Sequence, residues 1–418
     1  MRILVVTSHP PYPPHQGAAA RNLNVIRHLA TAHEMHLLTL VPPGQDWSDQ
    51  GPLPQWCASV TAVPGRSHSS LRRVIGVFSS TSPDMVLRHW SSPFQTAFLR
   101  LTRKVPFDVI QVENLEMAQY MAGSVKPSDR PLVVLDEHNA EYVLQRRAFH
   151  TDLRRPAKWP AAFYSYIQWR KLRHFERRSC QTADLVTAVS EVDQQALLDL
   201  APGLDVRIVP NGVDTDYFTY WEREASSFIK RPSIVFTGTM DFRPNVDGVL
   251  WFCQEILPHL RRRVPDLRLY IVGKRPNRAV RRLVSEYVTV TGAVEDVRPY
   301  FKHASVCVVP LRMGGGTRLK VLEAMASGTP VVSTNVGIEG LDVRDGVHAL
   351  LADDPAGFAS RVLELIADRR SAQTLSKAAR ALTEEKYDWR LIVPHLEECY
   401  VERRTTPLNS LGRTTRAG

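Results

Sequence analysis

Three glycines and two cations stand together in the segment Gly314-Gly315-Gly316-Thr317-Arg318-Leu319-Lys320. An apolar run typical of a strand precedes the glycines, and a helix is predicted from Thr317 to Ser327 with Thr317 as its N-cap. The amides of such a loop and the helix N-terminus favour an anion. A cation at a helix N-terminus is repelled by the positive end of the helix dipole. Arg318 and Lys320 both stand there, so they predict a bound anion, such as a phosphate, that offsets this repulsion. The alternative is a flexible glycine loop in which Lys320 pairs with Glu323.

Glu323 is a lone carboxylate in the otherwise apolar helix that follows. Acidic residues in nucleotide-binding α/β folds accept hydrogen bonds from the ribose diol, and Glu323 is a candidate for that role. The alternative is a solvated charge on the helix surface.

Two further candidates lie in the first half of the chain. His138 lies just after the predicted strand 132–136, near the end of a strand where α/β folds bind ligands. A lone histidine in a loop is usually structural. Gly17 ends a loop that contains four prolines, and an ordinary turn explains it almost equally well.

Short apolar runs alternate with longer helical patterns through most of the sequence, which predicts parallel sheets covered by helices. The first series of predicted strands is Ile3–Ser8, Met35–Val41, Phe107–Val112, Leu132–Asp136, Ala183–Val189 and Val206–Val209. The second series is Ser233–Gly238, Leu267–Val272, Tyr287–Thr291, Ser305–Val309 and Pro330–Ser333. Predicted helices of the first half include Ala18–Ala32 and Ala161–Gln181.

Turn residues at 210–214 and the polar stretch 222–231 separate the two series, so the linker is placed near 208–232. The predicted domains are 1–208 and 209–388. A last helix, 389–403, is long enough to pack back on the first domain, although Pro394 could bend it. The polar tail 404–418 is expected to be disordered.

Composition agrees with two globular domains: the chain has 418 residues, 44% of them hydrophobic and 23% charged. No apolar run reaches the roughly 18 residues of a membrane span, and the first run is too short for a signal peptide, so a cytoplasmic location is expected. Five scattered cysteines indicate neither a disulfide framework nor a zinc site. The net charge of +10 indicates an anionic partner.

The segment 146–178 interleaves cations with aromatic residues. The cations are Arg146, Arg147, Arg154, Arg155, Lys158, Arg170, Lys171, Arg173, Arg177 and Arg178, and the aromatics are Phe149, Trp159, Phe163, Tyr164, Tyr166, Trp169 and Phe175. This pattern fits a helix on an anionic membrane surface, which would make the protein peripheral at the inner face of the cell membrane. A solvated basic face with its aromatics in the core is nearly as good an explanation. Nucleic acid is not expected, because the segment contains no recognised module.

Several segments, in this order and spacing, resemble glycosyltransferase family 4. They are the Pro-rich loop to Gly17 and Arg21, Asp136-Glu137-His138-Asn139, Thr187-Ala188-Val189-Ser190, Val209-Pro210-Asn211-Gly212-Val213-Asp214, Phe236-Thr237-Gly238 and Gly316–Val332. The resemblance extends over nearly the whole chain. It implies the GT-B fold, an α/β architecture of two Rossmann-like domains whose parallel sheets face each other across a central cleft.

In this family, two glutamates eight residues apart serve the donor, the second on the ribose and the first on the sugar hydroxyls. Glu323 matches the second, but the first falls on Gly315, so backbone amides of the glycine loop are expected to contact the sugar. Many members also carry an arginine after the glycine that matches Gly238, and a lysine about six residues later, both on the diphosphate. Thr239 and Asn245 stand at those positions here.

These departures lead us to expect that Arg318 and Lys320 neutralise the diphosphate, with Arg243 a weaker candidate. The resemblance also implies that His138 hydrogen-bonds the transferring sugar or its phosphate. By the same resemblance, Gly17 lies beside the diphosphate and the acceptor.

The activity implied by the resemblance is metal-independent transfer of a sugar with retention of configuration. The nucleoside-diphosphate sugar is a co-substrate and no cofactor is expected; a glycan or lipid-linked hydroxyl accepts the sugar, in cell-surface polysaccharide or glycolipid synthesis. Two alternatives stay open: a nucleotide-sugar epimerase, and a non-catalytic GT-B partner subunit, which the missing first glutamate favours. A dinucleotide-dependent oxidoreductase is disfavoured because a Pro-rich loop, not a GxGxxG turn, follows the first strand.

Overall fold

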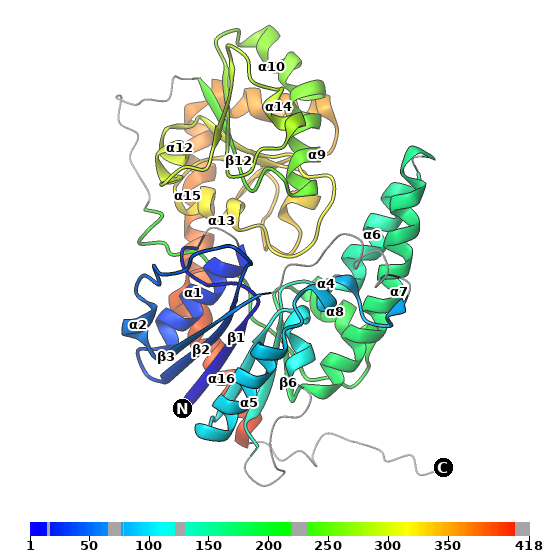
Figure 1. Cartoon of the computed structure of the whole chain (residues 1–418). Helices are drawn as coiled ribbons and strands as arrows, with labels where there is room; N and C mark the ends of the chain where they lie inside the picture. Colours follow the sequence, from blue (N-terminus) through cyan, green and yellow to red (C-terminus); the bar gives the residue numbers. More distant parts are fainter. Residues whose placement is uncertain are drawn as a thin grey trace. The chain divides into compact units, whose positions relative to one another are not determined.

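The computed structural model describes residues 1–14, 17–65, 77, 79–121, 130–154, 156–219 and 232–405. The chain divides into two compact units, which we describe separately: unit 1 is Met1–Val209 with Ile392–Gly418, and unit 2 is Pro210–Leu391. Both are α/β units with parallel sheets, as the alternating pattern predicts (Figure 1). Most of the expected tail, from 406 on, lies outside the described residues.

Unit 1 is built on a seven-stranded sheet in the order β3-β2-β1-β4-β5-β6-β7, with every neighbouring pair parallel. Its strands are β1 (Arg2–Thr7), β2 (Glu34–Val41), β3 (Cys57–Pro64), β4 (Val109–Glu113), β5 (Leu132–Glu137), β6 (Leu185–Ala188) and β7 (Val206–Ile208). Its helices are α1 (Gly17–Leu29), α2 (Leu53–Trp56), α4 (Asp84–Arg88), α5 (Ser92–Lys104), η1 (Leu115–Tyr120), α6 (Glu141–Leu153), η2 (Pro156–Lys158), α7 (Trp159–Thr182) and α8 (Glu191–Leu200).

Unit 2 is built on a six-stranded parallel sheet in the order β10-β9-β8-β11-β12-β13. Its strands are β8 (Ser233–Thr237), β9 (Arg268–Val272), β10 (Val288–Gly292), β11 (Val306–Val309), β12 (Val331–Ser333) and β13 (Leu350–Leu351). Its helices are α9 (Arg243–Trp251), η3 (Phe252–Ile256), α10 (Leu257–Arg263), α11 (Arg278–Arg281), α12 (Arg298–His303), α13 (Leu319–Ala326), η4 (Val336–Ile338), α14 (Pro355–Ala367) and α15 (Arg369–Lys386).

The last helix, α16 (Trp389–Thr405), belongs to unit 1 from Ile392 on. It contains Pro394 and extends two residues past the predicted end at Arg403. Tyr400 on this helix is fully buried in unit 1. The C-terminal segment is therefore a structural part of the first unit.

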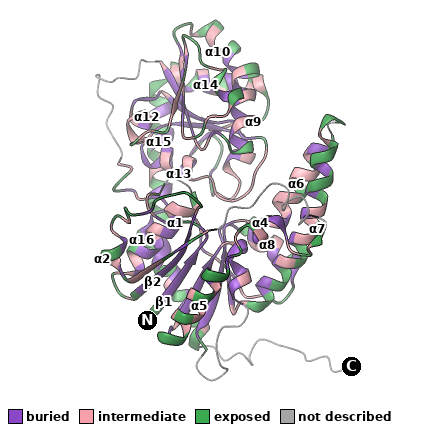
Figure 2. Cartoon of the chain, in the orientation of Figure 1, coloured by how far each residue is buried: buried purple, intermediate pink, exposed green. Residues whose placement is uncertain are grey.

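The central strands of both sheets are buried, as Figure 2 shows in purple, which explains why they read as unbroken apolar runs. Parallel strands end at one edge of a sheet, so residues that close neighbouring strands become neighbours. In unit 1 the register pairs Glu113 of β4 with Asp136 of β5. Asp136 is in turn paired with Thr187 of β6. In this row of polar side chains, Asp136 stands two residues before His138 in the chain.

Candidate functional site

The glycine loop of unit 2 leads into α13, but the helix begins later than predicted. It starts at Leu319, with Arg318 at the N-cap position in an extended conformation and no side-chain cap. The expected N-cap, Thr317, is therefore wrong. The reason is the guanidinium of Arg318, whose Nη1 donates to the carbonyl oxygens of Gly316, at 2.8 Å, and Gly315. These bonds hold the backbone of the loop in a conformation that is not helical.

Gly314 is required by this same contact. Its φ is +132°, a value that side-chain-bearing residues rarely adopt, and a Cβ there would lie 2.8 Å from Nη2 of Arg318. Glycine therefore allows the guanidinium to lie against the loop. The predicted grouping of the three glycines with Arg318 is present in the structure.

Lys320 lies one residue inside α13 and points at the end of β8. Its Nζ donates to Oδ1 of Asn245 at 2.7 Å and lies 4.2 Å from the centre of the Phe236 ring. Burial, together with the nearby Arg318 charge, lowers the pKa of Lys320 to about 7. The alternative pairing with Glu323 is absent: no ion pair joins these two described residues.

Gly238 closes this cluster from the side of β8. A Cβ on Gly238 would lie 2.7 Å from Nδ2 of Asn245 and 2.8 Å from Nζ of Lys320, and its φ is +149°. Nδ2 of Asn245 also donates to the carbonyl oxygen of Thr239 at 2.9 Å. Of the two positions at which many family members carry cations, Asn245 thus accepts from the Lys320 ammonium, and the carbonyl oxygen of Thr239 holds the Asn245 amide.

Glu323 lies on α13 one turn after Lys320 and is half-buried. Burial raises the pKa of its carboxyl to about 7, and the Lys320 charge opposes this shift. No described residue donates a hydrogen bond to the carboxylate. Burial raises the pKa of Tyr217, and the Glu323 charge adds to this rise. The centre of the Tyr217 ring lies 3.9 Å from the Arg298 guanidinium. The carboxylate is therefore available to a ligand hydroxyl.

Arg243, the weaker candidate, is exposed at the first residue of α9 and makes no contact with Lys320. Gly17 is exposed at the first residue of α1, and the two residues before it lie outside the described part of the chain. Neither position is brought into the clusters that surround Lys320 and His138.

His138 follows β5 directly, as predicted, and belongs to a buried cluster in unit 1. Its Nε2 lies 2.9 Å from Oε2 of Glu113 and 3.4 Å from Oδ2 of Asp136. Arg21, fully buried on α1, donates to both oxygens of Asp136 at 2.7 and 3.0 Å. In the interior of unit 1, the cations Arg21 and His138 thus pair with the carboxylates of Asp136 and Glu113.

The charges in this cluster support one another. Burial alone would lower the pKa of the His138 imidazole, but its hydrogen bonds to Asp136 and Glu113 outweigh burial and raise the pKa to about 9. Burial would raise the pKa of Asp136, yet the charges of Arg21 and His138 bring it well below its usual range. His138 is therefore an imidazolium near neutral pH, and Nδ1, which has no partner among the described residues, is its free donor.

The donor atoms of Glu113, Asp136 and His138 lie within 4.8 Å of one another, a spacing that could also hold a metal ion. Arg21 already occupies both oxygens of Asp136, and a divalent cation there would lie against its guanidinium. We therefore interpret the cluster as an ion-pair network.

The sequence also contains one Asp-x-Asp pattern, Asp214-Thr215-Asp216. Asp214 accepts from the amides of Asp216 and Tyr217, and Asp216 pairs with Arg390 at 3.2 Å. These carboxylates have structural partners and do not converge on one point with a third acidic group.

Two family models match consecutive parts of the chain and together cover most of it. Residues 15–217 match "Glycosyltransferase Family 4" and residues 231–368 match "Glycosyl transferases group 1". The chain consists of a glycosyltransferase family 4 domain followed by a glycosyl transferases group 1 domain. The resemblance inferred from the sequence motifs is confirmed.

Curated relatives include mannosyltransferases. The chain is 31% identical over 251 residues to the "GDP-mannose-dependent alpha-(1-6)-phosphatidylinositol monomannoside mannosyltransferase" of Mycolicibacterium smegmatis, covering 54% of this chain and 65% of that protein. It is 28% identical over 245 residues to the protein of the same name from Mycobacterium tuberculosis, covering 53% and 63%. The match thus spans less than two thirds of each relative.

Several solved structures match almost the whole chain. Sucrose-phosphate synthase from Thermosynechococcus elongatus has a TM-score of 0.70 at 18% identity and covers 96% of this chain and 99% of its own. Anabaena HepE in complex with UDP and glucose has a TM-score of 0.66 at 16% identity, covering 96% and 100%. These likenesses confirm the GT-B fold.

For a family 4 glycosyltransferase, the sequence reasoning missed one residue next to the histidine. Glu113 ends β4, the strand beside β5, and a search of neighbouring strand ends would have found it. Lys320 and Asn245 are 75 positions apart in the sequence, so no local sequence pattern predicts their contact.

Proposed function

We propose that this chain transfers a hexosyl or related sugar from a nucleoside-diphosphate sugar to a hydroxyl acceptor, with retention of configuration and without a metal ion. The observation that carries the proposal is the meeting of Lys320, Arg318 and the glycine loop beside Gly238, at the carboxyl ends of β8 and β11. Open α/β sheets bind ligands at that edge.

The leaving group of such a transfer is a nucleoside diphosphate, whose negative charge grows in the transition state. The Lys320 ammonium, the Arg318 guanidinium and the amides of Gly314–Gly316 supply positive potential at one place. Groups held in position before the reaction stabilise developing charge most effectively. We therefore assign to Arg318 and Lys320 the role of the cations that are missing at positions 239 and 245.

Glu323 is assigned to the ribose diol because it is half-buried and accepts no hydrogen bond from a described residue. Gly315 replaces the carboxylate that the family places on the sugar, so we assign sugar contacts to loop amides. Arg243, exposed at the start of α9, is retained only as an outer contact to the diphosphate.

His138 is assigned as a hydrogen-bond donor to the transferring sugar or its phosphate. Two carboxylates hold its Nε2 and leave Nδ1 to a ligand. An imidazolium has no free lone pair, so this histidine would not act as a general base. Gly17 remains a proposed contact to the diphosphate or acceptor.

The names of relatives suggest two donors to test. The mycobacterial relatives are GDP-mannose-dependent by name, and HepE structures contain UDP, glucose or UDP-glucose. The acceptor is proposed to be a glycan or a lipid-linked hydroxyl, in cell-surface polysaccharide or glycolipid synthesis.

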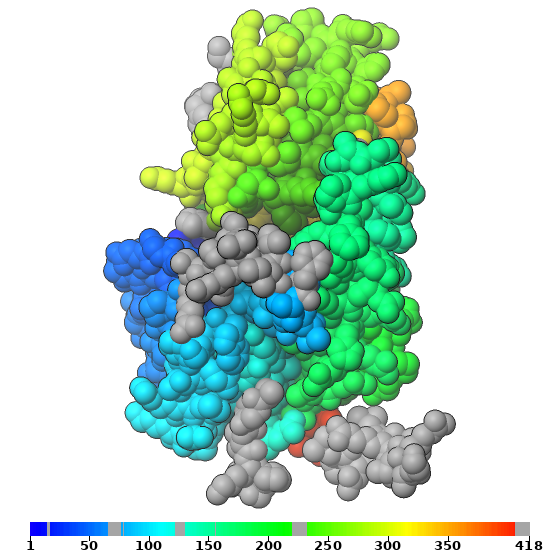
Figure 3. Space-filling view, turned by 45° about the vertical axis from the view of Figure 1, so that its right-hand side comes forward, coloured from blue at the N-terminus to red at the C-terminus, as the bar shows by residue number. Residues whose placement is uncertain are grey.

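We also propose that α6 and α7 dock on an anionic membrane surface at the inner face of the cell membrane. The two helices pack against each other and form a continuous face of unit 1 (Figures 1 and 3). Trp159 and Phe163, near their outer end, are each 59% exposed. No described helix is long and apolar enough to cross a bilayer.

Some aromatic residues of the segment 146–178 fit a solvated basic face with aromatics in the core, and others fit membrane docking. Phe149 stacks on Trp169, with ring centres 6.1 Å apart, and Phe175 packs on the core, as a solvated basic face requires. Trp159 and Phe163 are exposed, as docking requires. The docking proposal therefore rests on the outer end, and co-sedimentation with phosphatidylglycerol vesicles but not phosphatidylcholine vesicles tests it; a double substitution of Trp159 and Phe163 by serine should abolish the difference.

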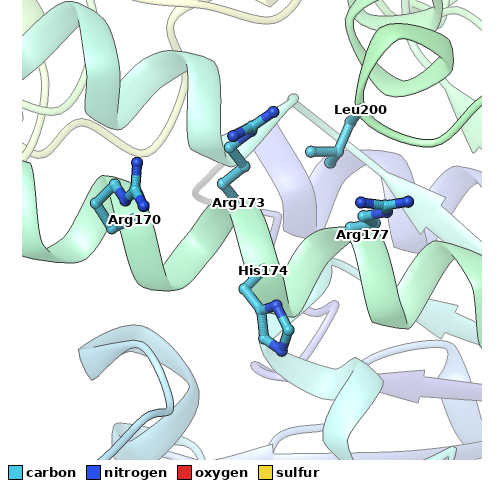
Figure 4. Close-up of a pocket in the computed structure, with 5 residues that line it drawn as sticks. All are labelled: Arg170, Arg173, His174, Arg177 and Leu200. Carbon is cyan, nitrogen blue, oxygen red and sulfur yellow. The ribbon is translucent and has the colours of Figure 1, made fainter.

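A shallow cationic pocket lies further along α7. Arg170, Arg173 and Arg177 lie along the helix with Leu200 at the end of α8 nearby, while His174 points away from Arg173 (Figure 4). These arginines add positive charge to the same helix as Trp159 and Phe163. An anionic surface would satisfy them.

The central experiment is calorimetric binding of UDP, GDP and ADP, followed by release of nucleoside diphosphate from GDP-mannose and UDP-glucose with and without candidate acceptors. Micromolar binding that Arg318→Ala and Glu323→Ala both weaken supports the donor site. Acceptor-dependent release supports a transferase, and acceptor-independent conversion supports an epimerase. A folded protein that binds no nucleotide is instead a non-catalytic subunit.

A further inference from the structure

A line of buried hydrogen bonds runs from the C-terminal helix to His138. The hydroxyl of Tyr400 on α16 donates to Oε1 of Gln111 on β4. Nε2 of Gln111 donates to Oε1 of Glu113 at 2.5 Å, and Oε2 of Glu113 faces Nε2 of His138 at 2.9 Å. Tyr400, Gln111 and Glu113 are all fully buried. The last helix of the chain is thus joined to the histidine through three side chains of one unit.

Chemistry fixes the direction of every bond in this line. Burial and the Asp136 charge raise the pKa of Glu113, and the His138 and Arg21 charges oppose this rise. In its ionised form the carboxylate only accepts hydrogen bonds, so Gln111 turns its amide nitrogen toward Glu113. The amide oxygen of Gln111 then faces Tyr400, and the hydroxyl there must donate. The Tyr400 hydroxyl therefore selects one of the two orientations of the Gln111 amide.

The other oxygen of Glu113 is held from α1. The Asn22 amide, oriented with its nitrogen toward acceptors, donates to Oε2 of Glu113 at 2.8 Å and to the carbonyl oxygen of Ala18 at 3.1 Å. The charged and titratable groups that face Glu113 are Arg21 from α1, Asp136 and His138 from β5, and Tyr400 from α16. With three donors fixed around it, the carboxylate has one orientation toward His138.

We propose that Tyr400 and Gln111 are positioning residues for His138: they orient Glu113 so that it holds Nε2 of the imidazolium and aims Nδ1 at the ligand. The proposal rests on the function assigned to His138 above. It gives α16 a part in the active site although no residue of that helix contacts His138 directly in this line.

Removing the Tyr400 hydroxyl separates positioning from packing. Phenylalanine fills the same space, so Tyr400→Phe removes only the donor. The Gln111 amide is then free to rotate, and its oxygen would repel Glu113 when it faces the carboxylate. Glu113 loses a donor and its fixed direction, and the imidazolium loses its fixed partner.

The matched control is Tyr120→Phe in the same unit. Tyr120 is also fully buried, and its hydroxyl donates to the carbonyl oxygen of His89 at 2.6 Å and accepts from the amide of Ser91 at 2.8 Å. Its loss removes a buried tyrosine hydroxyl that has no bond to the network. Any effect that the two variants share is due to stability alone.

The first readout is the kinetics of sugar transfer by the full-length protein. Tyr400→Phe should lower kcat by about three- to tenfold, the size expected when one neutral hydrogen bond is lost, and leave the KM for the donor unchanged. Gln111→Met should have the same effect, and the double variant should be no worse than either single variant because both remove the same link. Tyr120→Phe should keep wild-type kcat.

The second readout does not depend on activity. In protein labelled with ¹⁵N-histidine, the Nε2 proton of His138, shared with a carboxylate, should resonate far downfield. Tyr400→Phe should shift or broaden this signal, and Tyr120→Phe should not. If transfer activity is never found but the signal changes in this way, the proposed function fails while the positioning role stands. An unchanged signal and kcat in Tyr400→Phe, or equal changes in both tyrosine variants, would overturn the role.

Discussion

The pKa of Lys320 leads to a prediction about the pH dependence of nucleotide binding. Burial and the Arg318 charge lower the pKa of the free ammonium to about 7, so the empty site holds about half a proton on Lys320 at neutral pH. A diphosphate beside the ammonium favours its charged form and raises the pKa again. Binding should therefore take up a proton, and affinity should fall as pH rises through 7.

The magnitude follows from the charged fraction. With a pKa of about 7, Lys320 is about half charged at pH 7 and about one per cent charged at pH 9, so the affinity for UDP or GDP should fall roughly fiftyfold over this range. The terminal phosphate of the nucleotide titrates near pH 6 and is already ionised throughout this window. The dependence should therefore come from the protein.

Calorimetry in buffers of different ionisation enthalpy measures both quantities. At pH 8 the proton uptake should approach one per nucleotide, less any proton that Glu323 releases. Lys320→Met should bind about ten- to one-hundredfold more weakly at pH 7, the range for a hydrogen bond to a charged group, and should lose the fall in affinity that wild type shows as pH rises. The two proteins should converge in affinity toward pH 9.

One result would refute this reasoning. If wild-type protein binds nucleotide equally well at pH 7 and pH 9, with an enthalpy independent of the buffer, Lys320 does not become charged on binding. The diphosphate would then lie elsewhere. Equal behaviour of wild type and Lys320→Met at every pH would lead to the same conclusion.

Three further predictions concern Glu323, Arg21 and the contact between Gly273 and Gly238. Glu323→Gln should weaken UDP binding about tenfold but leave binding of a 2′-deoxynucleotide unchanged, and equal losses for both nucleotides by calorimetry would contradict a ribose contact. Arg21→Met should lower the free energy of unfolding in urea by about 3–5 kcal/mol because it leaves Asp136 buried without its partner, whereas Arg2→Met, which removes an exposed pair, should change it little. Since the folded-state pKa of Asp136 is lowered, the loss should be full at neutral pH and should shrink as pH falls below about 4. Gly273→Ala should destabilise the protein by roughly 3 kcal/mol or more, because its Cβ would overlap the carbonyl oxygen of Gly238, whereas Gly292→Ala, also at a positive φ (+73° against +150°) but facing open space, should cost about 1 kcal/mol in the same thermal unfolding assay.

The sequence predicted the strands that lie inside the two described sheets and the edge strands β7 and β10, but it missed the edge strands β3 and β13. Interior parallel strands are buried on both faces and read as apolar runs, as β1, β4 and β8 do. β3 (Cys57–Pro64) is an edge strand with half-buried residues, and β13 has two residues, so neither shows such a run. Edge strands owe their position to a neighbour more than to their own composition.

The start of α13 shows a different limit. Threonine is a favourable N-cap, and Thr317 stands where a helix should begin. The structure instead bends the Arg318 side chain back onto the carbonyls of its own loop, which delays the helix by two residues. A long cationic side chain can satisfy backbone carbonyls that propensity rules assign to other partners.

The departures at Thr239 and Asn245 and the presence of Lys320 are best understood as one change. Asn245 Oδ1 accepts from the Lys320 ammonium at 2.7 Å, so a lysine at position 245 would place a second ammonium against the first. In a half-buried site that repulsion would be strong, because water screens it poorly. Under the proposed function, the diphosphate cation can lie at position 245 of α9 or at position 320 of α13, but an ammonium at both positions needs an anion to hold it. The sequence alone shows a loss at two positions; the structure shows that the ammonium reaches the same place from another helix.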